Sequence, residues 1–300
     1  MTTTETVPAP SATLALRDGR LLDWRQRPLI MGVLNITPDS FSDGGEWLEP
    51  GAAVERAQRM IQEGADLLDL GAESTRPGGG VYGQGAEAVA ATVEIDRLLP
   101  VLEPLREACD LPISVDTRKG EVARAALAAG ADLINDISGL ADPELGAAVA
   151  AAACPVVLMH SRGQLSSMQR EIDFTNVVAE VTAELGRKVE RAQALGVARQ
   201  QILIDPGIGF GKTTAQNLEL LRRIDALTSL ELPVLIGASR KSFIGELDGA
   251  GPTQRLAGSL AAVAWAARHG AAVVRVHDVA DTRQFLSVWQ AISSARGFES

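Results

Sequence analysis

Apolar runs recur along the chain at a spacing that suits strands alternating with helices. Eight of these runs are rich in valine, leucine and isoleucine. Strands that are apolar on both faces are typical of a parallel sheet that helices cover on either side. The eight predicted strands are residues 29–36, 67–72, 113–117, 133–137, 156–160, 202–207, 234–239 and 273–278.

The segments between these runs have helical periodicity. Residues 55–63 and 121–129 place apolar side chains at intervals of three and four, and Gly64 or Gly130 follows. Gly270 precedes the last predicted strand in the same way. A glycine at this point is typical of a helix that ends in a left-handed cap. The repeated order of helix, glycine and strand predicts a chain built from βα units.

Two architectures accommodate such units. An open doubly wound sheet is favoured by a Gly-x-Gly-x-x-Gly sequence after the first strand, and this chain has none there. Eight strands in about 250 residues favour a closed barrel instead. We predict an α/β fold, a single (β/α)8 TIM barrel over residues 14–300, with its active site at the C-terminal ends of the strands. Residues 1–13, rich in threonine, proline and alanine, are predicted to be a disordered tail.

Composition narrows the choice of partners and location. The formal charge is −10, and the sequence holds no basic cluster longer than a pair, so neither a nucleic acid nor a membrane surface is an expected partner. No apolar run approaches the roughly 20 residues that span a bilayer. The first residues lack the basic start and apolar core of a secretory signal. We therefore expect a cytoplasmic protein whose ligands are small molecules.

The C-terminal ends of the predicted strands are unusually polar. In a barrel these ends meet on one rim, so their side chains converge on one site. A single polar residue there would serve equally well as a helix cap or a loop contact, but a set at every strand is harder to explain in that way. The set comprises Asn35, Glu73, Thr75, Arg76, Asp116, Asn135, His160, Asp205, Ser239, Arg240, Lys241, Arg275 and His277.

These residue types indicate binding rather than covalent catalysis. The sequence offers no Cys–His pair, three-histidine zinc set or nucleophile elbow. Asp116, Asn135 and Asp205 suit the edge of a flat heterocycle, because an ionised Asp accepts two hydrogen bonds and Asn can both accept and donate. Lys241 can donate to a ring atom. The cations form a second group, suited to a phosphate or diphosphate: Arg76, Arg275 and His277.

Eight sequence motifs follow one another along the chain: MGVLNITPDSFSDGG (31–45), DLGAESTRPGG (69–79), SVDT (114–117), NDISG (135–139), LMH (158–160), DPGIGFGK (205–212), GASRKSFIG (237–245) and RVHDV (275–279). Together these motifs resemble the dihydropteroate synthase family. The resemblance is ordered along the chain and covers roughly residues 29–292. It implies condensation of 6-hydroxymethyl-7,8-dihydropterin diphosphate with p-aminobenzoate to give 7,8-dihydropteroate, a transferase step in folate biosynthesis.

The resemblance also implies roles for individual residues. Asp43, Lys241 and Arg275 would act at the reacting centre, Asn35 would bind Mg²⁺ with the diphosphate, and the protein would be a homodimer. The pterin diphosphate would contact Thr75, Arg76, Asp116, Asn135, Ile137, Met159, Asp205, Lys241, Arg275 and His277. The p-aminobenzoate would contact Phe41, Thr75, Pro77, Phe210 and Ser239. Among these, we expect Arg275 to serve only the departing diphosphate.

Two stretches differ from the commonest family pattern. Ser161 stands where methionine or tryptophan is more usual, and residues 78–86 are richer in glycine.

A pterin-dependent methyltransferase barrel would need neither Phe41 nor the stretch 239–241, so their presence disfavours it. A non-catalytic pterin-binding paralogue stays open, because intact motifs do not prove turnover.

Overall fold

The computed structural model describes residues 12–37, 49–75, 88–170 and 172–294. Within them, eight parallel strands form one sheet, and each of the eight predicted runs contains one of its strands. The (β/α)8 fold is thereby confirmed. The strands are β3 (Leu29–Asn35), β4 (Leu67–Gly71), β5 (Ile113–Asp116), β6 (Leu133–Asp136), β7 (Val156–Met159), β8 (Ile202–Asp205), β9 (Leu235–Ile236) and β10 (Val273–Val276).

The sheet closes on itself as a barrel. Its strands follow the order β8-β7-β6-β5-β4-β3-β10-β9. An isolated parallel bridge between Ile204 and Val234 joins the two outer strands. The Ile204 amide also donates to the Pro233 carbonyl oxygen at 3.0 Å, which continues the parallel pairing across the seam. All eight C-terminal strand ends therefore point to the same rim.

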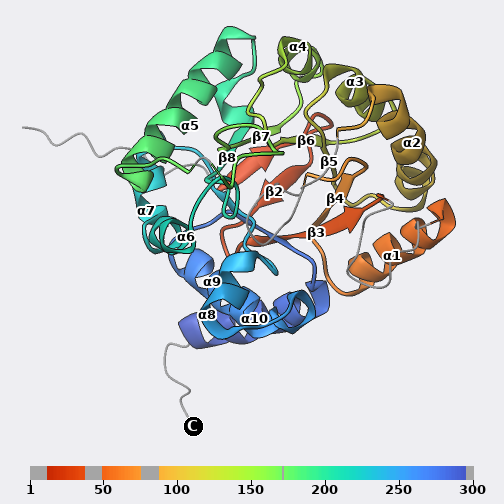
Figure 1. Cartoon of the computed structure of the whole chain (residues 1–300). Coiled ribbons are helices and arrows are strands. Elements are labelled where there is room, and N and C mark those ends of the chain that lie inside the picture. The colour runs from red at the N-terminus through yellow and green to blue at the C-terminus, as the bar shows by residue number, and fades with distance from the viewer. Residues whose placement is uncertain (1–11, 38–48, 76–87, 171, 295–300) are drawn as a thin grey trace, which may run out of the picture.

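Helices surround the barrel in the view of Figure 1. The predicted helical segments 55–63 and 121–129 fall on α1 and α3, and the glycines after them, Gly64 and Gly130, have positive φ angles of 97° and 98°. Gly270 has φ 80°, as a left-handed cap requires. The helices are α1 (Pro50–Gln62), α2 (Ala91–Ala108), α3 (Gly120–Ala128), α4 (Pro143–Ala151), α5 (Val177–Ala194), α6 (Thr214–Arg222), α7 (Ile224–Leu227), α8 (Ser242–Asp248), α9 (Leu256–Arg268) and α10 (Val279–Ser294), with 3-10 turns η2 (Arg199–Gln201), η3 (Thr228–Leu230) and η4 (Pro252–Gln254).

A short antiparallel hairpin packs at the N-terminal end of the barrel. Its strands are β1 (Thr13–Ala15) and β2 (Leu21–Asp23), and the side chains of Leu14 and Leu22 are buried with barrel residues such as Met31. This hairpin was not predicted, because three-residue strands leave no readable alternation. It covers the end opposite to the polar rim. The first eleven residues of the predicted tail lie outside the described residues.

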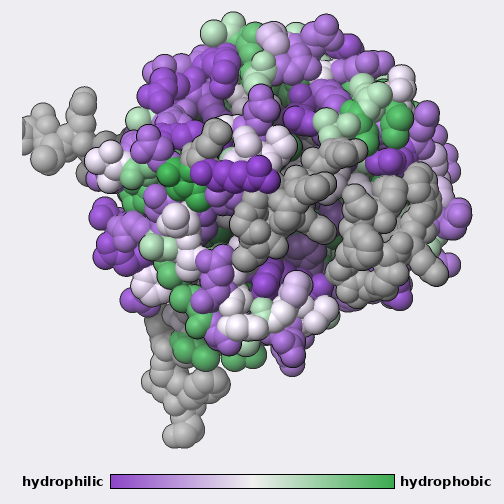
Figure 2. All heavy atoms as spheres, in the orientation of Figure 1, coloured by the Kyte–Doolittle hydropathy of each residue, from purple (hydrophilic) through white to green (hydrophobic). Residues whose placement is uncertain are grey.

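The face shown in Figure 2 is mainly hydrophilic, with hydrophobic side chains scattered among polar ones. In the described part of the chain, no helix combines the length and apolar character that crossing a membrane requires.

Candidate active site

A pocket opens at the C-terminal rim, where the sequence predicted it. Its wall includes every described residue that was assigned to the pterin or p-aminobenzoate sites, together with Ile208 and Gly237. Asn35, at the exposed end of β3, does not line the pocket but lies beside it: Asn35 Oδ1 and Asp116 Cβ are each 3.7 Å from the place where a Cβ on Gly71 would stand. The pocket is lined by Thr75, Asp116, Asn135, Ile137, Met159, Asp205, Ile208, Phe210, Gly237, Ser239, Lys241, Arg275 and His277. Four predicted site residues lie outside the described residues: Phe41, Asp43, Arg76 and Pro77.

A buried ionic frame holds the centre of this pocket. Arg275 Nε donates to Asp69 Oδ2 at 2.6 Å, and its Nη2 donates to Asp116 Oδ2 at 3.0 Å. The same Asp69 oxygen accepts a hydrogen bond from Asn135 Nδ2 at 3.1 Å. Asp69 is fully buried, so its charge depends on these partners. The expectation that Arg275 serves only the leaving group is therefore wrong, since it also anchors two carboxylates.

The frame aims hydrogen-bond acceptors into the pocket. The side-chain nitrogen Nδ2 of Asn135 faces Asp69. The side-chain oxygen Oδ1 of Asn135 is therefore left for the pocket side. Asp116 Oδ1 is buried and has no hydrogen-bond partner among the described residues. Burial raises the pKa of Asp116 to about 7, although the nearby Arg275 charge lowers it. A ligand that donates to Asp116 would supply the missing hydrogen bond and favour the ionised form.

Asp205 adds another acceptor from the end of β8. Its Oδ1 accepts from the Gly207 amide at 2.7 Å, while Oδ2 lies 3.9 Å from the place where a Cβ on Gly237 would stand. Burial raises the pKa of Asp205, and the hydrogen bond from Gly207 opposes that effect. Gly207 has φ +66°, and a Cβ there would lie 1.9 Å from the His160 carbonyl oxygen. Only glycine allows this turn to approach β7 so closely.

The opposite side of the pocket is apolar with one cation. Ile137, Met159, Met168 and Phe210 form a hydrophobic cluster suited to the face of a flat ring. Lys241 Nζ lies 4.2 Å from the centre of the Phe210 ring. Burial lowers the pKa of Lys241 to about 8, and the Arg275 charge adds to the effect. The pocket therefore combines an apolar wall, oxygen acceptors and a buried amine.

Ser239 and His277 form a neutral pair at the pocket edge. The His277 amide donates to Ser239 Oγ at 3.2 Å, and the hydroxyl lies 3.0 Å from His277 Nδ1. Burial lowers the pKa of His277 to about 3, and the Arg275 charge contributes. If the hydroxyl donates to Nδ1, the proton of the neutral ring sits on Nε2, and His277 serves an anion as a neutral donor.

Some polar rim residues have structural partners instead. Glu73 accepts from Arg118 at 3.0 Å and from Lys119 at 2.9 Å, and Lys119 also contacts Glu94 at 2.6 Å. Burial would raise the pKa of Glu73, but the hydrogen bonds from Arg118 and Lys119 lower it below its usual value. This cluster joins the end of β4 to α2 and to the start of α3. Glu73 therefore supports the rim without lining the pocket.

Two departures from the family pattern have different outcomes. Ser161 donates a hydrogen bond to the Ile137 carbonyl oxygen at 2.8 Å, so it ties the ends of β6 and β7 together beside the apolar wall. The glycine-rich stretch 78–86 lies outside the described residues.

Within the described residues, no group of three or more His, Cys, Asp and Glu side chains is arranged to hold an ion. Asn35 offers one neutral oxygen donor, which fits a magnesium ion held mainly by phosphate oxygens and water.

Sequence reasoning missed two residues on which the site depends, Asp69 and Lys212. Asp69 interrupts an otherwise apolar strand and points to the barrel interior, a signal that an acid there needs a buried partner. Lys212 is the last residue of the motif DPGIGFGK (205–212) and had no predicted role, yet it is 3% exposed and contacts the loop behind the pocket.

Comparisons with known proteins agree with this site. Residues 31–277 match the family described as pterin binding enzyme. The chain is 45% identical over 274 residues to a dihydropteroate synthase of Synechocystis, covering 91% of this chain and 92% of that one. A Xanthomonas albilineans dihydropteroate synthase solved with 4-aminobenzoic acid superposes with a TM-score of 0.86 at 48% identity, covering 95% and 99% of the two chains. A structure from the same organism with 7,8-dihydropteroate gives 0.82 at 45% identity, with 94% and 99% covered. The chain thus belongs to the pterin-binding enzyme family, among the dihydropteroate synthases.

Proposed function

We propose that the chain condenses 6-hydroxymethyl-7,8-dihydropterin diphosphate with p-aminobenzoate, releasing 7,8-dihydropteroate and diphosphate. The observation that carries this proposal is a set of three hydrogen-bond acceptors in the pocket, which suit a heterocycle edge rich in N–H donors. They are Asp116 Oδ1, which has no partner among the described residues, the side-chain oxygen Oδ1 of Asn135, and Asp205 Oδ2. The apolar cluster would pack against the ring face. A related synthase has been solved with 7,8-dihydropteroate, the expected product.

The reaction would need no protein nucleophile. Loss of diphosphate from the exocyclic methylene leaves a cation on the pterin, and the aniline nitrogen then attacks that carbon and loses its proton. Arg275, Arg76 and the Nε2–H of His277 would stabilise the charge on the departing diphosphate. Lys241, between the Phe210 ring and Asp205, would donate to a pterin ring atom.

Magnesium is part of the proposal, held by Asn35 together with the diphosphate oxygens. When bound, it would neutralise charge on the leaving group. Phe41, Thr75, Pro77, Phe210 and Ser239 are proposed to enclose p-aminobenzoate, and Asp43 to face the reacting carbon. A homodimeric assembly and a cytoplasmic location stay predictions.

Diphosphate release tests the proposal against a non-catalytic pterin-binding protein. The purified chain is mixed with the pterin diphosphate and magnesium, with and without p-aminobenzoate, and released diphosphate is measured alongside dihydropteroate by mass spectrometry. We expect stoichiometric release that depends on p-aminobenzoate. An Asp205→Asn variant serves as the matched control and should turn over far more slowly. Pterin binding without product would favour the non-catalytic alternative.

A further inference from the structure

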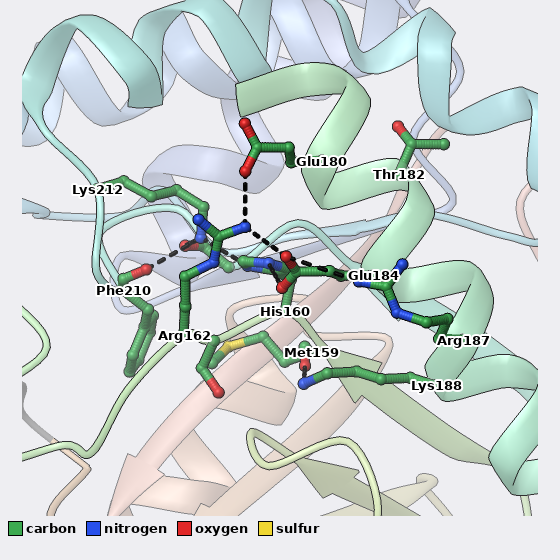
Figure 3. A network of polar contacts seen from close by, with 12 residues as sticks. Met159, His160, Arg162, Glu180, Thr182, Glu184, Arg187, Lys188, Phe210 and Lys212 are labelled. Carbon is green, nitrogen blue, oxygen red and sulfur yellow. Dashed lines mark hydrogen bonds and ion pairs between the residues drawn. The ribbon is translucent and has the colours of Figure 1, made fainter. Parts of the chain in front are cut away.

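A buried lysine lies directly behind the pocket wall, outside the set of lining residues. Lys212 Nζ is 3.0 Å from the Gly207 carbonyl oxygen, 2.9 Å from that of Phe210 and 3.0 Å from His160 Nδ1. Figure 3 shows this amine together with Phe210 and the His160 ring, and with Glu184 of α5 beyond the histidine. Its three contacts therefore span the end of β7 and both ends of the loop 207–210.

The contacts assign the protons in this network. His160 Nε2 lies 3.0 Å from Glu184 Oε2, and an ionised carboxylate can only accept, so Nε2 carries the hydrogen. His160 Nδ1 must then accept from the Lys212 ammonium, whose three protons match its three acceptors. Burial lowers the pKa of His160 to about 4 and that of Lys212 to about 7, so the proton between them stays on the lysine.

Glu184 fixes the far side of the histidine. It also accepts from Arg162, which binds Glu180 at 2.8 Å. The hydrogen bond from His160 lowers the pKa of Glu184 to about 2, and Arg162 adds to this against the effect of burial. The histidine is therefore held in one tautomer, with its acceptor nitrogen turned to Lys212.

The loop around Lys212 has an unusual backbone. Gly207, Gly209 and Gly211 all have positive φ angles, of 66°, 83° and 63°. Two of the loop's carbonyl oxygens turn inward to the ammonium, while Gln169 binds the Gly209 carbonyl oxygen at 2.7 Å. The Gly207 carbonyl oxygen also accepts from the Phe210 amide at 3.1 Å, so without Lys212 it would keep one donor, whereas the Phe210 carbonyl oxygen and His160 Nδ1 would each lose the donor that Lys212 supplies. A buried acceptor without a donor is costly, so this backbone course favours a cation inside it.

We propose that Lys212 is a positioning residue for the pterin site, an internal cation around which the loop 207–210 folds and which His160 holds in place. The proposal rests on the proposed pterin function. The ammonium itself does not touch the ligand. It acts through the loop, which carries Phe210 of the ring wall and the Gly207 amide that orients the Asp205 carboxylate.

A first experiment removes the cation. Lys212→Met keeps an unbranched side chain, one atom shorter, and loses the three hydrogen bonds of the ammonium. Calorimetry with 6-hydroxymethylpterin, an unreactive probe, should show at least tenfold weaker binding than in the parent chain. Arg191→Met is the control, because it removes another cation that donates to a rim carbonyl, that of Gly139 at 2.9 Å, outside the pocket. Its pterin affinity should stay within threefold of the parent.

A second experiment separates the two hydrogen bonds of His160 and needs no change at Lys212. In His160→Asn the amide oxygen can replace Nδ1 as the acceptor for Lys212, whereas in His160→Gln the amide nitrogen can replace Nε2 as the donor to Glu184. We expect the asparagine variant to bind the probe within threefold of the parent and the glutamine variant to bind at least tenfold more weakly. Packing alone would penalise the asparagine variant at least as much as the glutamine variant, because asparagine is the smaller side chain and leaves the larger cavity.

A spectroscopic measurement checks the proton assignment directly. The chain has three histidines, so ¹⁵N-histidine labelling gives few ring signals. His160 should appear as a neutral ring with hydrogen on Nε2, and its Nδ1 signal should move toward that of an unpaired nitrogen in Lys212→Met.

The outcomes divide clearly. A parent chain that fails to bind the probe would contradict the pterin function itself. A parent that binds, with a folded Lys212→Met that binds equally well, would overturn the positioning role. If Lys212→Met does not fold, the histidine pair decides, and a loss of affinity in His160→Asn that equals or exceeds the loss in His160→Gln would overturn the proposal.

Discussion

Replacing Arg275 with methionine tests whether the ionic frame holds the pocket together. The change keeps an unbranched side chain in the barrel but removes both ion pairs, to Asp69 at 2.6 Å and to Asp116 at 3.0 Å. Asp69 then retains only the hydrogen bond from Asn135 among the contacts of the described structure. We expect a folded but less stable protein with a weakened pterin site.

The magnitude follows from the burial of the partners. Removing one member of a buried ion pair costs about 3–5 kcal/mol, because a charge is left without compensation. The Arg275 side chain is 20% exposed, and Asp69 and Asp116 are 0% and 6% exposed, so solvent screens the arginine in part. We therefore expect a loss near the lower end, about 3 kcal/mol at pH 8.

The loss should depend on pH, and its sign can be worked out. Burial already raises the pKa of Asp116 to about 7, and removing the Arg275 charge raises that pKa further. A carboxyl group whose pKa is higher in the folded chain than in the unfolded chain makes stability fall as pH rises between the two values. In the Arg275→Met variant the free energy of unfolding continues to fall above pH 7. The difference in this free energy between variant and parent should therefore be smaller at pH 5.5 than at pH 8.

Urea unfolding at pH 5.5 and 8 measures the loss in the free energy of unfolding. Calorimetry with 6-hydroxymethylpterin measures the affinity of the pocket for a pterin. Pterin affinity should drop about tenfold at pH 7.5, since a protonated Asp116 presents fewer acceptors. Arg27→Met is the control: it removes a pair with Asp66, at 2.6 Å, before the start of β4 and so at the other end of the barrel, and it should leave affinity unchanged. Unchanged stability at both pH values, together with unchanged pterin affinity, would refute the frame.

Two further predictions concern the loop after β8. Asp205→Asn should weaken pterin binding by about 2–4 kcal/mol in calorimetry, because the Gly207 amide takes the amide oxygen and leaves the NH2 group facing a ligand donor. Gly207→Ala should lower the free energy of unfolding by more than about 3 kcal/mol, since left-handed strain of about 1–2 kcal/mol adds to a Cβ placed 1.9 Å from a backbone oxygen. Gly270 has a similar φ of +80° but open space around it, so denaturant titration of Gly270→Ala should show only the cost of backbone strain. Equal losses in the free energy of unfolding in both variants would contradict the clash.

The strands, and the polar residues at their C-terminal ends that line the rim pocket, could be predicted because each depends on local sequence. A strand covered on both faces must be apolar throughout, so β5 (Ile113–Asp116) and β8 (Ile202–Asp205) stand out from their flanks. Their last residues, Asp116 and Asp205, are polar because they reach the rim. Barrel geometry then brings all such ends together without knowledge of any single contact.

The hairpin and the network behind the pocket could not be predicted in this way. The hairpin strands are three residues long, and only burial of Leu14 and Leu22 against the barrel defines them. Lys212 follows three glycines in a stretch that is equally consistent with an exposed loop. Its burial depends on the positive φ angles that turn Gly207 and Phe210 carbonyl oxygens inward, and a sequence pattern does not give those angles.

The ionic frame shows why closure of the barrel is itself part of the site. Asp69 on β4 contacts Arg275 on β10 across β3, and it contacts Asn135 on β6 across β5. Each contact skips a strand, as expected where alternate strands fill one layer of a barrel interior. The inward curvature of the barrel brings these side chains together, so their positions are fixed by folding, before any ligand arrives. The cost of burying these charges is therefore part of the free energy of folding and not of ligand binding. The acceptors that face the pocket then need little rearrangement when the pterin binds.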